Sequence, residues 1–360
     1  MTVRFVPDAV WIERAEWDTP LARTVRARWA GALESFDDGG AARVASVRDG
    51  KRLLVVQRNR GTFLRHCPAG TAGLVCCNYL VVNLASNCPM DCSYCFLQDY
   101  LTDAPALTAY TNVDDALAEI DAVLRAHPER SFRIGTGELS DSLALDPLTD
   151  LSRQLVPFFA ARPNALLELK TKTDCVDHLL DLDPAGRVVV SWSLNAASVI
   201  TRDEPGTATL DERLAAASRV QNAGYRVGFH FDPLVEFDGW EQEYAAAVDA
   251  VAAAVDRAAV AWISLGSLRL SPALAEAVRR RTALGHVAGA ELVPGIDGKA
   301  RVWRGLRLRM YRVLAARLRA ALGDVPLYLC MEPPAVWERV MGEVPTDRVL
   351  GMRLAAGAAW

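Results

Sequence analysis

Three cysteines with close spacing are the residues most suited to chemistry in this chain. Cys88, Cys92 and Cys95 form a CxxxCxxC run, and the aromatic residue Tyr94 stands directly before the last thiol. This spacing suits three thiolates on one tight loop that bind three irons of a 4Fe-4S cluster, and the run offers no fourth cysteine. The remaining iron can chelate the amino and carboxylate groups of S-adenosylmethionine. We therefore expect a cluster that passes an electron to this cofactor and releases a 5'-deoxyadenosyl radical.

Other roles for these cysteines fit the sequence less well. A disulfide framework requires an oxidising compartment, and the first residues, 1–8, contain no long apolar core typical of a secretion signal. A structural zinc site usually has four ligands in two spaced pairs. Unligated structural thiols are the remaining alternative.

The composition describes a globular chain. It has 360 residues, of which 51% are apolar, enough for one large α/β barrel domain or two smaller ones. Charges interrupt every apolar stretch before the ~18–20 residues that span a bilayer, so we expect a soluble, cytoplasmic protein without a membrane partner. The net charge of -4 does not favour wholesale attraction to nucleic acid, although a local basic face is compatible with it.

Strand-like and helix-like runs alternate from about residue 79 onward. Asp114 to Ala126 and Glu241 to Val255 show helical spacing, and Thr209 with Glu212 forms a capping box that opens a helix to Asn222. The six expected strands are 79–85, 131–137, 166–172, 188–195, 226–234 and 261–270. Six βα units in succession predict a parallel sheet with right-handed crossovers, closed or partly closed into a barrel.

This pattern divides the chain into three parts. Residues 1–78 are predicted to form an N-terminal extension with a basic helix over 20–35. Residues 79–290 are predicted to form the partial barrel. Residues 291–360 are predicted to form a C-terminal extension that completes the core and supplies an element for contact with substrate or DNA.

Polar residues follow the expected strands, where α/β barrels carry their chemistry. The backbone of Gly137 and the carboxylate of Glu138 suit the ammonium of a bound methionyl group. Lys172 suits the methionyl carboxylate, and Ser193 and Asn195 suit that carboxylate or the ribose. The alternatives are an ordinary turn, a solvated lysine and strand-end caps. Asp232, which ends the fifth strand, is a further candidate cofactor contact.

Five other residues lie in sequence patterns that leave their roles open. Cys67, Cys76 and Cys77 could form a second metal site, supply a hydrogen atom, or pack in the core, which is the simplest interpretation. Cys330 is predicted to lie in or near the core. His230 is predicted to be a hydrogen-bonded structural residue, with the active-site cavity as its alternative location.

One dense basic run, 297–312, contains aromatic residues. Cations neutralise phosphates and aromatic faces stack on bases, so Lys299, Arg301, Trp303 and Arg304 are candidate nucleic-acid contacts. The alternative is an amphipathic helix from Leu306 with arginines on a solvated face.

Together these residues resemble the spore photoproduct lyase family, a branch of the radical S-adenosylmethionine enzymes. The matching stretches are 76–79, 88–98, 135–146, 171–172, 193–195, 228–233 and 329–332. The resemblance implies a partial (β/α)6 barrel of the TIM-like radical S-adenosylmethionine type, a 4Fe-4S cluster and S-adenosylmethionine. It also implies Ser140, Lys172 and Ser193 as cofactor contacts, Tyr94 beside the cluster, and a C-terminal hairpin that meets DNA.

Two positions depart from that family. DNA-repairing members carry a hydrogen-donating cysteine where this chain has Glu138, and a carboxylate cannot replace it because its O–H bond is too strong. Phe96 stands where those members use a tyrosine in the radical relay. Tyr94 and Glu138 are nevertheless candidate catalytic residues because of their expected positions beside the cluster and the cofactor. Cys76 or Cys77 could replace the hydrogen-donating cysteine.

The resulting hypothesis is a lyase-like radical enzyme that acts on a thymine-dimer DNA lesion and receives electrons from a donor such as flavodoxin or ferredoxin. One alternative is a radical enzyme for a different nucleoside, small metabolite or peptide. Another is a nucleic-acid-binding protein with a non-catalytic iron-sulfur cluster.

Overall fold

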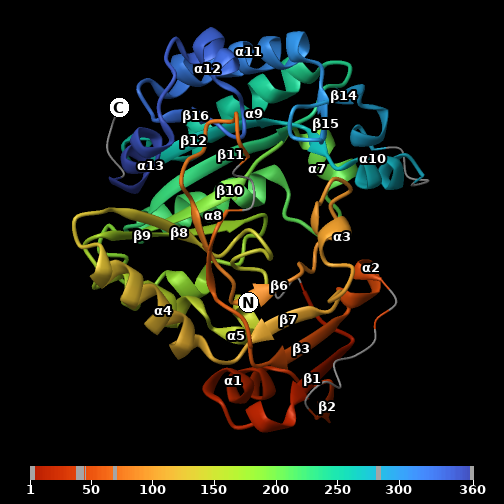
Figure 1. Ribbon diagram of the computed structural model, residues 1–360, viewed down its shortest axis with the longest axis vertical. Helices are drawn as coiled ribbons and strands as arrows, with labels where there is room; N and C mark the ends of the chain where they lie inside the picture. Colours follow the sequence, from red (N-terminus) through yellow and green to blue (C-terminus); the bar gives the residue numbers. More distant parts are fainter. Residues whose placement is uncertain (1–4, 38–43, 45, 68–70, 281–284, 357–360) are drawn as a thin grey trace.

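A curled, eight-stranded sheet forms the centre of the computed structural model, which describes residues 5–37, 44, 46–67, 71–280 and 285–356 (Figure 1). Its strand order is β16-β12-β11-β10-β9-β8-β5-β4. The bounds are β4 Leu64–His66, β5 Leu80–Val82, β8 Phe132–Gly135, β9 Ala165–Thr171, β10 Val188–Ser193, β11 Arg226–Leu234, β12 Val260–Ser267 and β16 Leu327–Leu329. Only β4 runs antiparallel to its neighbour.

The six predicted strands supply six adjacent members of this sheet, so the predicted partial barrel is confirmed. The first run, 79–85, is divided, because β5 ends at Val82 and β6 (Ala85–Ser86) joins another sheet. The edge strand β16, which was not among the predicted strands, extends the sheet beside β12.

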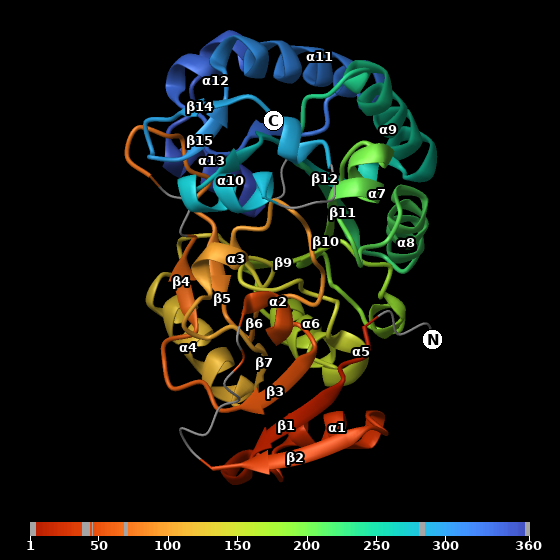
Figure 2. The ribbon, with the colours of Figure 1, turned by 90° about the vertical axis from the view of Figure 1, so that its right-hand side faces the viewer.

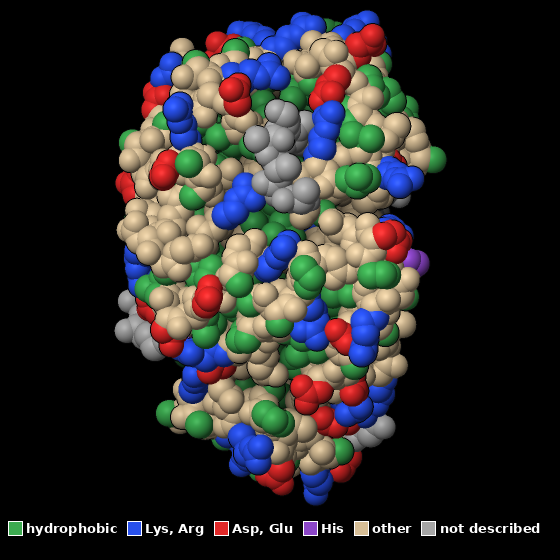
Figure 3. Space-filling model, turned by 90° about the vertical axis from the view of Figure 1, so that its left-hand side faces the viewer, with side chains coloured by type: hydrophobic (Ala, Val, Ile, Leu, Met, Phe, Trp, Pro, Cys, Tyr) green, Lys and Arg blue, Asp and Glu red, His purple; other side chains and the backbone are tan. Residues whose placement is uncertain are grey.

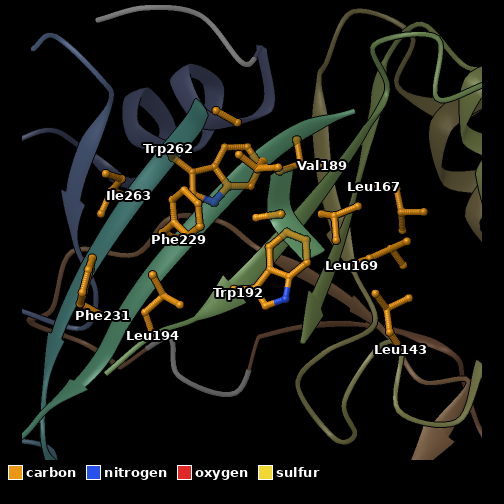
Figure 4. Close-up of a cluster of buried hydrophobic side chains, with 14 of the residues drawn as sticks. Leu143, Leu167, Leu169, Val189, Trp192, Leu194, Phe229, Phe231, Trp262 and Ile263 are labelled. Carbon is orange, nitrogen blue, oxygen red and sulfur yellow. The ribbon is translucent and has the colours of Figure 1, made fainter. Parts of the chain in front are cut away.

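Alternating side chains explain how the sheet separates a core from a site. Trp192, Phe229 and Phe231 lie on the apolar face and are fully buried (Figure 4). Ser193, which follows Trp192, and His230, which lies between the two phenylalanines, are polar and line a cavity. Successive strand residues point to opposite faces, so one face of the sheet packs in the core and the other carries polar groups.

Helices pack around the sheet. The helices are α4 Val113–Ala126, α5 Asp146–Thr149, α6 Ser152–Ala160, α7 Ala197–Asp203, α8 Leu210–Asn222, α9 Trp240–Ala254, α10 Pro272–Arg279, α11 Arg304–Leu322, α12 Pro334–Met341 and α13 Asp347–Ala356. Short 3-10 turns lie at Arg14–Glu16, Asp177–Leu179, Arg257–Ala259 and Val287–Gly289. The predicted capping box of α8 is confirmed, since Thr209 and Glu212 bond each other's backbone N–H groups.

A second, five-stranded sheet of order β2-β1-β3-β7-β6 lies at the opposite end of the molecule from α11 and α12 (Figures 1 and 2). Its bounds are β1 Ala9–Glu13, β2 Ala32–Phe36, β3 Leu53–Gln57, β6 Ala85–Ser86 and β7 Leu107–Tyr110. This sheet combines strands from before and after residue 78. The N-terminal extension and the start of the barrel region therefore share a core.

The predicted helix over 20–35 is wrong in its second half. Helix α1 spans Pro20–Arg28 and stops where Trp29 adopts an extended backbone. Residues of β2 then pair in parallel with β1. The helical prediction missed this strand because its side chains are mostly exposed and show no apolar alternation.

Smaller elements surround the cysteine loop. Helix α2 (Val47–Gly50) contacts α3 (Leu97–Tyr100), which directly follows the cysteines, and α3 contacts α10 (Figure 2). A three-stranded antiparallel sheet, β13 Arg269–Leu270, β15 Ala300–Val302 and β14 Leu292–Pro294, precedes α11.

The surface carries charges of both signs. On the face in Figure 3, basic and acidic side chains are interspersed. Within the described ranges, none of the helices has the length and apolar character that crossing a membrane requires.

Candidate active site

A cavity of about 550 Å³ lies beside the cysteine loop and the carboxyl ends of β8 to β12. The cysteine loop and the ends of the second to fifth predicted strands contribute residues to it. The predicted site residues that line it are Cys77, Cys88, Cys92, Tyr94, Cys95, Gly137, Glu138, Ser140, Lys172, Ser193, Asp232 and Lys299.

The cysteine loop is buried enough to disfavour free thiolates. Burial raises the pKa of Cys92 to about 12 and that of Cys88 well above its ordinary value, with Asp141 adding to the effect at Cys88. Iron bound to these sulfurs would supply the positive charge that stabilises them as thiolates. Among the residues that the structure describes, no three Cys, His, Asp or Glu side chains converge on one metal ion. The spacing of Cys88, Cys92 and Cys95 along the chain suits a cluster, in which each thiolate binds a different iron.

Side chains hold the loop in a defined conformation. Nε2 of Gln98 donates to the carbonyl oxygens of Cys92, Ser93 and Cys95 at 3.0, 3.1 and 3.2 Å. Nδ2 of the fully buried Asn87 donates to the carbonyl of Pro105 at 2.6 Å. These hydrogen bonds hold the backbone of the loop, and with it the positions of the three cysteines.

A buried ion pair lies beneath Tyr94. Nζ of Lys172 lies 3.0 Å from Oε1 of Glu204, and the Tyr94 hydroxyl bonds both groups. Nη2 of Arg213, which is inaccessible to solvent, lies 2.6 Å from Oε2 of Glu204. Burial alone would raise the pKa of Glu204, but Lys172 and Arg213 lower it to about 2. The carboxylate therefore stays ionised and fixes the lysine at the cavity wall.

A second charge network supports the cavity. Nη2 of the buried Arg133 lies 2.7 Å from Oε2 of Glu168, whose Oε1 lies 2.7 Å from Nε2 of His230. The Arg133 guanidinium also lies over the ring of Tyr79, 4.6 Å from its centroid. The Tyr79 hydroxyl and Nη1 of Arg133 have no hydrogen-bond partner within the described part of the chain.

The close packing here requires glycine at position 135. A Cβ at Gly135 would lie 1.5 Å from the Tyr79 hydroxyl oxygen, and one at Gly137 would lie 2.8 Å from Cβ of Lys170. The Gly-Thr-Gly-Glu turn therefore approaches its neighbours more closely than a larger residue allows.

Two further charged groups face the cavity from the far strands. Arg269 forms a two-point ion pair with Asp232, with N···O distances of 2.9 and 2.8 Å. Burial would raise the pKa of Asp232, but Arg269 holds it below its ordinary value. The Cys330 sulfur lies 3.7 Å from Nη2 of Arg269. Cys330, which was predicted to lie in or near the core, lines the cavity.

Several predicted site residues lie elsewhere. Asn195 is buried outside the cavity, where its amide donates to the carbonyl of Pro233 and accepts from Tyr244. Cys76 does not line the cavity, and its backbone N–H donates to Asp347. These contacts give Asn195 a structural role at the strand ends.

The residues of the basic run, 297–312, differ in their exposure to solvent. Arg301 is buried and pairs with Asp297 at 2.6 Å, so its cation stabilises the β14–β15 hairpin. Trp303 is 63% exposed, and Arg304 begins α11. The predicted amphipathic helix is confirmed from Leu306, although Arg307 on it is buried against Glu332 rather than solvated.

Lys51, Glu204 and Arg213 were not among the predicted site residues. Lys170 was also missed, although it had a usable sequence signal, because Glu168 and Lys170 alternate with Leu167 and Leu169 along β9. The others had none, since they come from loops and helices that only the tertiary fold brings to the cysteines.

The chain is similar to known proteins over most of its length. A family model described as spore photoproduct lyase matches residues 5–269. A spore photoproduct lyase of Geobacillus sp. (strain Y412MC61) is 36% identical over 163 residues, 45% of this chain and 48%, about half, of that protein. One of Bacillus subtilis (strain 168) is 30% identical over 245 residues, 67% of this chain and 71% of that protein.

Solved structures match the fold over most of the chain. A spore photoproduct lyase double mutant with bound AdoMet and dinucleoside spore photoproduct has a TM-score of 0.78 and 24% identity, and covers 91% of this chain and 99% of that one. A spore photoproduct lyase complexed with dinucleoside spore photoproduct matches with a TM-score of 0.78, 23% identity and the same coverage.

Proposed function

Because the chain belongs to the spore photoproduct lyase family, we propose that it is a radical S-adenosylmethionine enzyme that repairs a thymine-dimer DNA lesion of the spore photoproduct type. The observation that carries this proposal is the single cavity that gathers three cluster-spaced cysteines with the polar ends of five strands. Chemistry and substrate binding can therefore occur at one site.

Cys88, Cys92 and Cys95 would hold a 4Fe-4S cluster in this cavity. When bound, the cluster supplies one electron for cleavage of S-adenosylmethionine, and the resulting carbon radical abstracts hydrogen from the substrate. A low-potential donor such as flavodoxin or ferredoxin would provide that electron.

The strand ends offer groups for S-adenosylmethionine. Glu138 and the backbone of Gly137 suit the methionyl ammonium, and Ser140 and Ser193 can hydrogen-bond its carboxylate or ribose. Lys172 is held by Glu204 with its ammonium at the cavity wall, where it can also attract the carboxylate. Asp232 suits the ribose hydroxyls but shares its charge with Arg269.

The lesion is supported as substrate by the family and by the hairpin beside the cavity. Lys299 lines the cavity, and the exposed Trp303 and Arg304 follow it along the chain. A cation and an aromatic face suit the phosphates and bases on either side of a lesion.

Cys77 is the thiol that best replaces the missing hydrogen donor. It lines the cavity, whereas its neighbour Cys76 does not. Its S–H bond would break as a C–H bond forms on the product radical, and one electron from the low-potential donor and one proton would return the thiyl radical to the thiol. Burial raises the pKa of Cys77, which keeps it in the protonated form that can donate hydrogen.

The test uses dinucleoside spore photoproduct with anaerobically reconstituted protein and dithionite. We expect two thymidine units from the wild type and from Cys76→Ala, and loss of at least ~90% of this product in Cys77→Ala. Formation of 5'-deoxyadenosine without lesion repair would favour a different nucleoside, metabolite or peptide substrate. Unchanged repair in Cys77→Ala would move the donor role to Cys330 or Cys67, the other described non-cluster thiols that line the cavity.

A further inference from the structure

One buried cation touches the cysteine loop from outside the barrel. Lys51 directly follows α2, in the N-terminal extension, and is only 5% exposed. Its Nζ donates to the carbonyl oxygen of Cys88 at 2.9 Å and also to that of Met90. The ammonium therefore lies against the first cysteine of the loop and the residue two positions beyond it.

The segment around Lys51 is built onto this loop. Val47 packs with Leu97 in a small apolar cluster that includes Cys88 and Cys95. The amide of Asn87 donates to the carbonyl of Val47 at 3.2 Å. Position 51 is thus fixed relative to the sulfurs by packing as well as by its own hydrogen bonds.

We propose that Lys51 is a positioning residue that orders the cysteine loop and raises the reduction potential of the cluster bound there. This inference rests on the proposed function, because it requires the cluster. Three thiolates give the site negative charge, and that charge grows when the cluster accepts an electron. A buried cation stabilises the more negative state, and it does so more strongly than a solvated one.

The chain provides a matched control for the charge. Arg48 lies on α2, just before Lys51 in the chain, and pairs with Asp91 of the same loop at 3.3 Å, but its side chain is 78% exposed. Water and salt screen that cation. Removing either residue deletes one positive charge, so the two variants differ in the burial of that charge and in its hydrogen bonds to the loop carbonyls.

The experiment measures the midpoint potential of the reconstituted cluster by EPR-monitored titration with dithionite. We expect Lys51→Met to disfavour reduction by about tenfold or more, a shift of about 59 mV or more to lower potential. Lys51→Arg, which keeps the charge, and Arg48→Met should each stay within about twofold of the wild type. An unchanged potential in Lys51→Met would overturn the inference.

Two further outcomes have defined meanings. If Lys51→Met does not retain iron, Lys51→Gln keeps the donors and removes the charge, and its potential must fall likewise for the inference to stand. If the wild type itself holds no 4Fe-4S cluster, the proposed function fails independently of Lys51.

Discussion

Lys172 and Arg213 bond different oxygens of the same carboxylate, with N···O distances of 3.0 Å to Oε1 and 2.6 Å to Oε2 of Glu204. Lys172 reaches the cavity wall, whereas Arg213 is inaccessible to solvent. Glu204 therefore balances one cation in the interior and one cation at the cavity wall. Its removal would leave one buried charge unpaired.

This relationship predicts a pH-dependent stability difference in the metal-free protein. At pH 7, Glu204→Gln should lower the free energy of unfolding by roughly 3 kcal/mol, because the pKa falls from 4.5 to about 2 on folding. A depressed carboxyl pKa stabilises the fold above the unfolded-state value, and this contribution fades as the pH falls from about 4.5 toward 2. Urea unfolding at pH 7 and pH 3 measures the difference.

The control for that measurement is Glu276→Gln, which removes an exposed carboxylate paired with Arg280 on α10. It should unfold nearly as the wild type does at both pH values. A stability gap for Glu204→Gln that is the same at pH 7 and pH 3 would contradict the ionised, doubly paired carboxylate.

Glu138 is predicted to contact the ammonium of S-adenosylmethionine. Glu138→Gln should weaken cofactor binding roughly tenfold to 100-fold, since it replaces a charge-assisted hydrogen bond by a neutral one. Equilibrium dialysis with labelled S-adenosylmethionine measures this. Iron content should match the wild type, because Glu138 is not a cluster ligand. Unchanged affinity would leave Glu138 with a turn role only.

Gly135 is predicted to be irreplaceable on steric grounds. Gly135→Ala places a methyl group 1.5 Å from the Tyr79 hydroxyl oxygen and should cost roughly 1–3 kcal/mol of stability. Gly289→Ala is the matched control, because no atom lies within 4 Å of its added Cβ. Thermal denaturation compares them. Equal melting temperatures would show that Tyr79 moves aside without cost.

The hairpin and the start of α11 are predicted to contact the phosphates of a longer DNA strand. A Lys299→Ala, Arg304→Ala double variant should bind a lesion-containing oligonucleotide more weakly, and its salt slope should be reduced by about 1–2. The control is Arg309→Ala, which removes an exposed arginine of α11 that pairs with Glu241 of α9. Identical salt slopes in all three proteins would exclude this surface.

The sequence allowed prediction of the barrel strands and the strand-end residues because both follow local rules. Apolar runs of the right length predicted β8 to β12, and the parallel order then placed Gly137, Lys172 and Asp232 at one edge. The Thr209–Glu212 capping box was equally local and is confirmed. Such features need only neighbouring residues and a known sheet direction.

Features that depend on distant segments were not predictable. Lys51 reaches Cys88 across 37 positions, and Arg133 reaches Glu168 across 35, with no sequence signal that links either pair. The burial of Arg301 was also not predictable, because an arginine in a basic run gives no sign that it will pair with Asp297 in the interior. Long-range pairing of charges is decided by the packing of whole elements.

The measurement that tests the central claim most directly is the yield of 5'-deoxyadenosine from reconstituted, dithionite-reduced protein supplied with S-adenosylmethionine under anaerobic conditions. We predict a measurable yield from the wild type and none above background from Cys92→Ala, because one iron must remain free of protein sulfur to bind the cofactor. Equal yields from the two proteins, or none from the wild type with a full complement of iron, would contradict the account.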